Sequence, residues 1–220
     1  MRFKFHHRDK WTCANLDLVE ESLEKHPKAI VLVGGASSSG KSYSAQTLKS
    51  FLEQNGHHAV IISLDQYNFG LSGIIPNKVN ENLFHGELPN RPEIRSRIKK
   101  IIYDVPFDEK YRPEQIQKIR GSIHNLVDPS ILDKFLQGLY DEWKVLNFDE
   151  PTVYDLASAA NDVKELYKNG TILEKKYSKV ISEQIPNDSV IDGKQYDVIL
   201  VEGIYALSKG MLLNLSGYDY

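Results

Sequence analysis

Three apolar runs along the chain have the pattern of buried parallel strands. They cover residues 29–33, 59–64 and 196–201, and each is nearly continuous in aliphatic side chains instead of alternating with polar ones. Such runs are typical of strands that are covered on both faces. A helical pattern at residues 41–55, ended by Gly56, separates the first two runs. We therefore predict a strand–helix–strand unit with a right-handed crossover, in a parallel sheet that the third run completes.

Helical periodicity and turn residues divide the remaining segments. A short helix is expected at residues 15–26, with Asn15 as its cap, and another at about 152–168. Short strands are expected at 171–180 and 189–191. A short helical stretch should follow at roughly 206–214.

Residues 70–147 are predicted to be a mainly helical insertion. Glycine, proline and asparagine dominate residues 70–90, which we expect to form a loop. Three short helices should follow, beginning at Pro92, at Arg112 and after Asp128. The third carries a broad apolar stripe, which is more typical of packing against the core or a partner chain than of a cofactor site.

The most specific motif lies directly after the first predicted strand. Gly35 and Gly40 are separated by four residues, and Lys41 and Ser42 follow, which is the phosphate-loop spacing G-x-x-x-x-G-K-[ST]. The four intervening residues are Ala36, Ser37, Ser38 and Ser39. Backbone N–H groups of such a loop form a nest for phosphates, the lysine adds a positive charge, and the serine hydroxyl can bind Mg²⁺. The alternative is a glycine- and serine-rich turn without a ligand, which the flanking strand and helix disfavour.

Acidic residues follow the other two predicted strands. Asp65 comes after the second strand and Glu202 after the third, so both should reach the edge of the sheet where open α/β sheets bind ligands. Asp65 could accept the proton of an attacking hydroxyl or hold Mg²⁺ through water, and Glu202 could orient Mg²⁺ or its waters. The alternative for each is a polar strand end that caps a turn. Asp149, in a loop before a predicted helix, could bind two ribose hydroxyls or cap that helix, and both interpretations stay open.

Composition narrows the classes of partner and compartment. The 220 residues carry a net charge of −3. The chain therefore lacks the excess of basic residues that would favour binding to nucleic acid or to an anionic membrane. Cys13 is the only cysteine, which excludes an intrachain disulfide and fits a reducing cytoplasm. No apolar run is long enough for a transmembrane helix. The basic residues near the N-terminus, among them Arg2 and Lys4, are expected to form a solvated tail.

Four segments together resemble the uridine kinase and phosphoribulokinase family. They are residues 33–42, Leu64-Asp65-Gln66-Tyr67, Asn147-Phe148-Asp149-Glu150-Pro151 and residues 200–204, in the family's order. The resemblance implies a single P-loop kinase domain over residues 1–220 that uses ATP and Mg²⁺ to phosphorylate the 5′-hydroxyl of uridine or cytidine.

Residue roles follow from the same resemblance. Asp65 would be the general base and Lys41 would bind the phosphates, while Ser42 and Glu202 would serve the metal. Tyr67, Asp149 and Tyr177 would contact the acceptor, with Asp149 on the ribose hydroxyls and Tyr177 near the pyrimidine.

The sequence also departs from the family pattern. Ser178 stands where the family has an aspartate, a family histidine is missing near Ser182, and Asn68 stands where a tyrosine is common. The family's arginine-bearing lid and C-terminal segment would come after Tyr220, so a C-terminally incomplete domain is expected. The alternatives are a P-loop kinase for a sugar, a sugar phosphate or pantothenate, and a nucleotide-binding module without catalysis. The insertion could cover the acceptor site or form a homo-oligomer contact.

Overall fold

The computed structural model describes residues 7–84, 92–104 and 112–218. The chain forms two compact units. The first contains the chain up to Tyr67, the segment Tyr154–Lys175 and the chain from Pro186 onward, and the second contains Asn68–Val153 and Lys176–Ile185. The expected basic tail lies partly at residues 1–6, outside the described residues.

A three-stranded parallel sheet forms the centre of the first unit. It contains β1 (Ala29–Gly34), β7 (Val198–Gly203) and β2 (Ala59–Ser63), in that order. The register places the ends of the strands together, because Gly34 lies opposite Gly203 and Ser63 lies opposite Glu202. The three predicted parallel strands are therefore confirmed, and every residue of the central strand β7 is buried.

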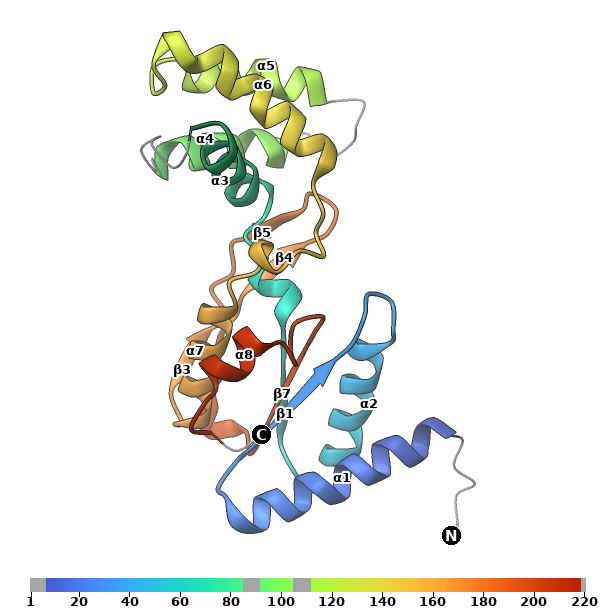
Figure 1. Ribbon diagram of the computed structural model, residues 1–220. Helices are drawn as coiled ribbons and strands as arrows, with labels where there is room; N and C mark the ends of the chain where they lie inside the picture. Colours follow the sequence, from blue (N-terminus) through green and yellow to red (C-terminus); the bar gives the residue numbers. More distant parts are fainter. Residues whose placement is uncertain (1–6, 85–91, 105–111, 219–220) are drawn as a thin grey trace. The chain divides into compact units, whose positions relative to one another are not determined.

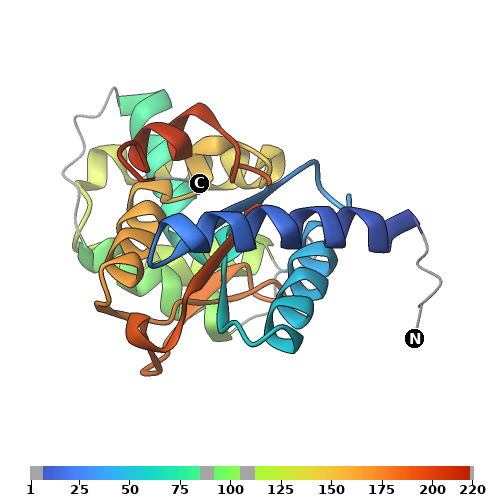
Figure 2. The same ribbon diagram turned by 90° about the horizontal axis from the view of Figure 1, so that it is seen from below.

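Helices cover both faces of this sheet (Figure 1). On β7, the side chains of Val198 and Leu200 belong to one apolar cluster, and those of Ile199 and Val201 belong to another. The first cluster includes residues of α1 (His7–Lys25) and α2 (Lys41–Gln54), and the second includes residues of α7 (Leu156–Tyr167) and α8 (Lys209–Asn214). The view from below has α1 in the foreground, where it packs against α2 (Figure 2). Two covered faces explain the continuous apolar runs and confirm the doubly wound α/β class.

The helix boundaries differ from the sequence prediction at two points. Helix α1 begins at His7, so Asn15 lies inside the helix instead of capping it. Asp155 is the N-cap of α7, and its carboxylate accepts hydrogen bonds from the backbone N–H and the hydroxyl of Ser158. The capping role considered for Asp149 therefore belongs to Asp155 in the case of α7.

A buried lysine joins peripheral elements of the first unit to β1. Lys28 precedes the strand and is 5% exposed. Its amine donates hydrogen bonds to the backbone carbonyls of Leu166, in α7, and Gly193. Gly193 begins the 3₁₀ turn η4 (Gly193–Gln195), which follows an antiparallel pair of short strands, β3 (Thr171–Leu173) and β6 (Val190–Asp192).

The second unit is a helical cluster with one small hairpin. Its helices are α3 (Leu71–Phe84), α4 (Pro92–Asp104), α5 (Arg112–Ile123) and α6 (Pro129–Val145), and its strands are β4 (Lys176–Ser178) and β5 (Glu183–Ile185). The three predicted helices are confirmed, and Asp128 caps α6. The predicted loop at 70–90 is wrong over α3, while residues 85–90 lie outside the described part. Leu71, Ile75 and Val79 recur at four-residue spacing and are buried, which stabilises α3 despite Pro76 inside it.

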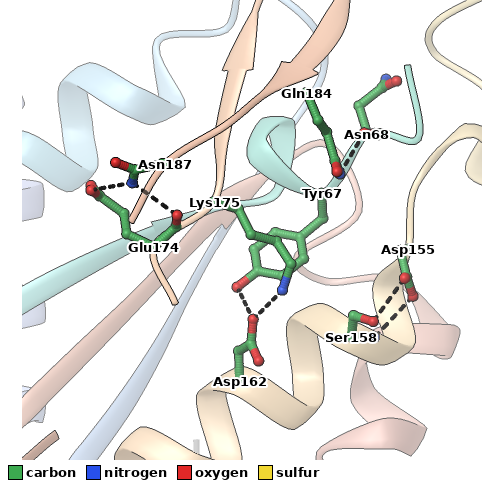
Figure 3. Close-up of polar contacts among 9 residues, drawn as sticks. All are labelled: Tyr67, Asn68, Asp155, Ser158, Asp162, Glu174, Lys175, Gln184 and Asn187. Carbon is green, nitrogen blue, oxygen red and sulfur yellow. Dashed lines mark hydrogen bonds and ion pairs between the residues drawn. The ribbon is translucent and has the colours of Figure 1, made fainter. Parts of the chain in front are cut away.

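Hydrogen bonds join the points at which the chain leaves the first unit and later returns to it. The backbone N–H of Asp155 donates to the carbonyl of Tyr67 at 2.9 Å. The side-chain amide of Asn187 donates to the backbone carbonyl of Glu174, also at 2.9 Å (Figure 3). Within the first unit, the segments before and after each excursion of the chain are thus held side by side.

Candidate functional site

The phosphate-loop motif forms an exposed turn between β1 and α2. Residues 35–40 are all exposed, and Ser38 and Gly40 have φ values of 59° and 91°. Gly40 is the N-cap of α2, so a left-handed residue without a side chain precedes the first turn of that helix. The first turn contains no acidic residue that would compete for its N–H groups. A helix N-terminus of this kind favours an anion, as the phosphate-loop interpretation requires.

Lys41 lies at the beginning of α2 and points back over the loop. Its amine donates a 2.7 Å hydrogen bond to the carbonyl of Ala36. The ammonium group therefore lies across the turn whose N–H groups would bind phosphate. A phosphate in the loop could take this proton donor in place of the carbonyl, because a charged pair of this kind is the stronger hydrogen bond.

Glu202 connects the loop to the neighbouring strand β2. The hydroxyl of Ser42 donates to one carboxylate oxygen of Glu202 at 3.1 Å, and the hydroxyl of Ser63 donates to the other at 2.5 Å. Glu202 is 5% exposed. The sequence indicated Ser42 and Glu202 but not Ser63, whose position opposite Glu202 depends on the strand register.

The donor set at this point suits a hard divalent cation. A serine hydroxyl and a carboxylate are oxygen ligands of the type that Mg²⁺ binds, usually together with waters and substrate phosphates. Among residues 7–84, 92–104 and 112–218, no group of three or more His, Cys, Asp or Glu side chains is arranged to hold a metal. A cation here would thus rely on Ser42, Glu202 and the ligands that a nucleotide brings.

Asp65 lies just beyond the end of β2, in the 3₁₀ turn η1 (Leu64–Tyr67). Its side chain is half-buried, whereas Leu64 and Tyr67 at the two ends of the turn are buried. Because the parallel strands end in register, the phosphate loop, Glu202 and the turn with Asp65 share one edge of the sheet, as predicted. The hydroxyl of Tyr67, expected at the acceptor, donates to Asp162 at 2.8 Å instead of pointing to solvent (Figure 3).

The other two acceptor candidates belong to the second unit. Asp149 is exposed, and its backbone N–H donates to the side-chain oxygen of Asn147 at 3.0 Å. Tyr177 lies on β4 opposite Gln184 and is half-buried. Asp149 and Tyr177 therefore belong to a different unit from the phosphate loop.

No protein-family model and no curated protein matches the sequence. Solved structures do match. A protein named YGR205w is 16% identical, with a TM-score of 0.50 over 91% of this chain and 54% of its own. A proposed fructose transport system kinase from Silicibacter sp. TM1040 is 15% identical, with a TM-score of 0.48 over 89% of this chain and 66% of its own. A proposed uridine kinase from Bacillus stearothermophilus is 10% identical, with a TM-score of 0.47 over 91% and 76%.

The chain thus spans between about half and three quarters of the length of these structures. At such identities the similarity concerns the fold and not the substrate. None of the helices in the described ranges has the length and apolar character that crossing a membrane requires. The expectation is confirmed at the level of the fold: the chain has an α/β fold with a parallel sheet, in which the phosphate-loop motif lies between β1 and α2, and it shares this fold with YGR205w.

Proposed function

We propose that the chain binds ATP with Mg²⁺ on residues 35–42 and transfers the γ-phosphoryl group to a hydroxyl of a small molecule. The observation that carries the proposal is the contact between Ser42, at the exit of the loop, and the buried carboxylate of Glu202. A phosphate loop alone could belong to many nucleotide-binding proteins. The added acid at the end of the adjacent strand, with Asp65 at the same edge, supports phosphoryl transfer.

The loop would bind the phosphates through its backbone and Lys41. The amine of Lys41 would exchange the Ala36 carbonyl for phosphate oxygens, which keeps the exposed ammonium group over the loop. Ser42 and Glu202 would hold Mg²⁺, which neutralises charge on the phosphates when bound. Ser63 would keep the second oxygen of Glu202 engaged, so that the carboxylate presents one orientation.

Asp65 would act as the general base. Its carboxylate would accept the proton of the acceptor hydroxyl, whose oxygen forms a bond to the γ-phosphorus as the bond to the β-phosphate bridging oxygen breaks and ADP leaves. The half-buried position of Asp65 on a short, anchored turn supports this role, since a base must be both accessible and fixed.

The acceptor that we favour is the 5′-hydroxyl of uridine or cytidine. The family resemblance supports it through Asp149 and Tyr177, while Ser178 and Ser182 stand where the family has residues near the base. A sugar, a sugar phosphate or pantothenate would use the same chemistry with a different acceptor. A nucleotide-binding module without catalysis is the alternative from another class.

The test measures ADP release from Mg²⁺-ATP against a panel of nucleosides, sugars and pantothenate, beside a titration of ATP binding. Stimulation by uridine or cytidine would support the favoured acceptor, and stimulation by another compound would keep the reaction and change the substrate. ATP binding without stimulation by any acceptor would contradict the kinase proposal and favour the non-catalytic module.

Three variants separate binding from chemistry. Lys41→Ala should abolish ATP binding, while Lys49→Ala, on the same helix and paired with Glu53, should leave it unchanged. Asp65→Asn should bind ATP nearly as well as the parent chain and lose phosphoryl transfer. Unchanged kinetics in Lys41→Ala would refute the phosphate-loop assignment, and a fully active Asp65→Asn would exclude Asp65 as the base.

A further inference from the structure

Tyr67 makes an unusual set of contacts for a core side chain. It is 2% exposed, and its hydroxyl donates to an oxygen of Asp162 on α7 at 2.8 Å. The amine of Lys175 donates to the same oxygen at 2.5 Å and lies 4.4 Å from the centre of the Tyr67 ring (Figure 3). The ring is therefore held by a carboxylate at its hydroxyl end and by a cation over its face.

Helix α7 holds the same residue at a second point. The backbone N–H of Asp155 donates to the carbonyl of Tyr67, and the side chain of Asp155 caps the helix through Ser158. The beginning of α7 thus fixes the main chain of Tyr67, while Asp162, two turns further on, fixes its side chain. We call Tyr67, Asp155, Asp162 and Lys175 the Tyr67 clamp.

The clamp anchors only one end of the turn that carries Asp65. At the other end, Leu64 is fully buried and lies against Gly203, where an added Cβ would be 2.6 Å from the Cβ of Leu64. Asp65 therefore lies between two fixed residues, while its own side chain remains half-buried. A short turn held at both ends can keep one side chain in a fixed direction without burying it.

Packing alone does not require the hydroxyl of Tyr67. A phenylalanine would fill almost the same volume, whereas a buried hydroxyl must be hydrogen-bonded to avoid a desolvation penalty. Burial, together with the neighbouring Asp162 carboxylate, raises the pKa of Tyr67 far above its ordinary value. The hydroxyl therefore stays protonated as a donor to Asp162, which suits it to orienting the turn and not to exchanging protons with a substrate.

We propose that Tyr67, Asp162 and Lys175 are positioning residues that aim the carboxylate of Asp65 at the acceptor hydroxyl. The inference rests on the proposed kinase function. It gives Tyr67 a different role from the acceptor contact that the family resemblance implies. In this proposal α7, which carries no residue of the phosphate site, acts on catalysis only through its contacts with η1.

The test compares hydroxyl and carboxylate deletions with a matched control. Tyr67→Phe should lower kcat by roughly 10- to 100-fold, because a displacement of about 1 Å at a reacting group can cost two powers of ten. The KM for ATP should change by less than about twofold. Asp162→Asn keeps an oxygen that can accept from Tyr67 and should retain most of kcat, whereas Asp162→Leu should lose as much as Tyr67→Phe. Tyr167→Phe, an equal hydroxyl deletion on α7, should leave kcat unchanged.

Amide hydrogen exchange over residues 64–67 gives a readout that does not depend on turnover. Tyr67→Phe should accelerate exchange there, and Tyr167→Phe should not. An unchanged kcat in Tyr67→Phe would overturn the inference, and so would a parallel loss of ATP affinity, which would mean general destabilisation. If the parent chain phosphorylates no acceptor, the kinase proposal itself fails. The exchange comparison then decides the clamp, and unchanged exchange in Tyr67→Phe would refute it.

Discussion

Gly203→Ala should disturb the functional edge of the sheet through a single methyl group. Gly203 ends β7 directly after Glu202, and a Cβ at this position would lie 2.6 Å from the Cβ and 3.0 Å from the Cγ and Cδ1 of Leu64. Carbon atoms at optimal contact are about 3.5–4.0 Å apart, so the backbone at Gly203 or the side chain of Leu64 must move by roughly 1 Å. Leu64 has little freedom to yield, because it is fully buried.

Overpacking of this kind costs about 1–3 kcal/mol in the free energy of unfolding. For a chain of this length, ~1 kcal/mol corresponds to about 2–4 °C in melting temperature. We therefore expect Gly203→Ala to lower the midpoint by roughly 2–12 °C. Turnover should fall by about tenfold or more beyond any loss of folded protein, because the shift falls between Glu202 and Asp65.

Gly210→Ala provides the matched control in the same unit. Gly210 lies exposed in α8, and an added Cβ would meet only Leu156 and Ser208 at 3.8–3.9 Å, which is ordinary contact. Replacing a helical glycine by alanine should raise stability by about 0.5–1 kcal/mol. Thermal and urea unfolding measure the stability of both variants, and ADP release from Mg²⁺-ATP by the folded protein measures their turnover. Equal stability and equal turnover for the two alanine variants would refute the close approach of β7 and η1.

Three further predictions concern buried or capping charges. Lys28→Met should lower the free energy of unfolding by about 1.5–3 kcal/mol, because it removes two hydrogen bonds from a buried charged donor while each carbonyl keeps a backbone donor. Lys25→Met, at an exposed helix end, should change nothing measurable in urea titrations. Burial raises the pKa of Glu183 above its ordinary value of 4.5, with only partial compensation from nearby donors and Lys99. The native state then keeps a proton that the unfolded chain has lost, so stability should fall as pH rises above about 4.5. Glu183→Gln should show a smaller fall than the parent chain between pH 5 and pH 8, and an identical fall would contradict this. Asp155→Ala should cost about 1 kcal/mol through loss of the α7 cap, while Asp155→Asn should cost much less in thermal melts.

Short sequence patterns are sufficient to predict the strands and helices that are formed by contiguous residues. The three strands and the helix after the phosphate loop follow from apolar runs and glycine spacing, and the common edge of Asp65 and Glu202 follows from parallel strands. The sheet order β1-β7-β2 could not be read in this way, because it depends on which distant segments pair. Helix α3 was missed because Gly73 and Pro76 are poor helix residues, and burial in the second unit outweighs their propensity.

The residues of the candidate site also differ in whether the sequence alone could identify them. The phosphate loop is contiguous, so its residues could be identified from the sequence. The contacts of Ser63 with Glu202 and of Tyr67 with Asp162 join residues 139 and 95 positions apart. No spacing rule records such pairs, and the hydroxyl of Tyr67 has the same sequence signature whether it faces a substrate or a buried carboxylate.

The hydrogen bonds that join Tyr67 to Asp155 and Glu174 to Asn187 indicate that the second unit could be deleted from the chain without breaking the first. Each excursion into the second unit starts and ends at neighbouring points of the first, a span that a tight turn can bridge. Two short turns in place of residues 68–153 and 176–185 would keep the sheet, the phosphate loop and Glu202 in one continuous chain. The molecule is in this sense modular: the first unit could serve as a host into which unrelated modules are grafted at the same two junctions.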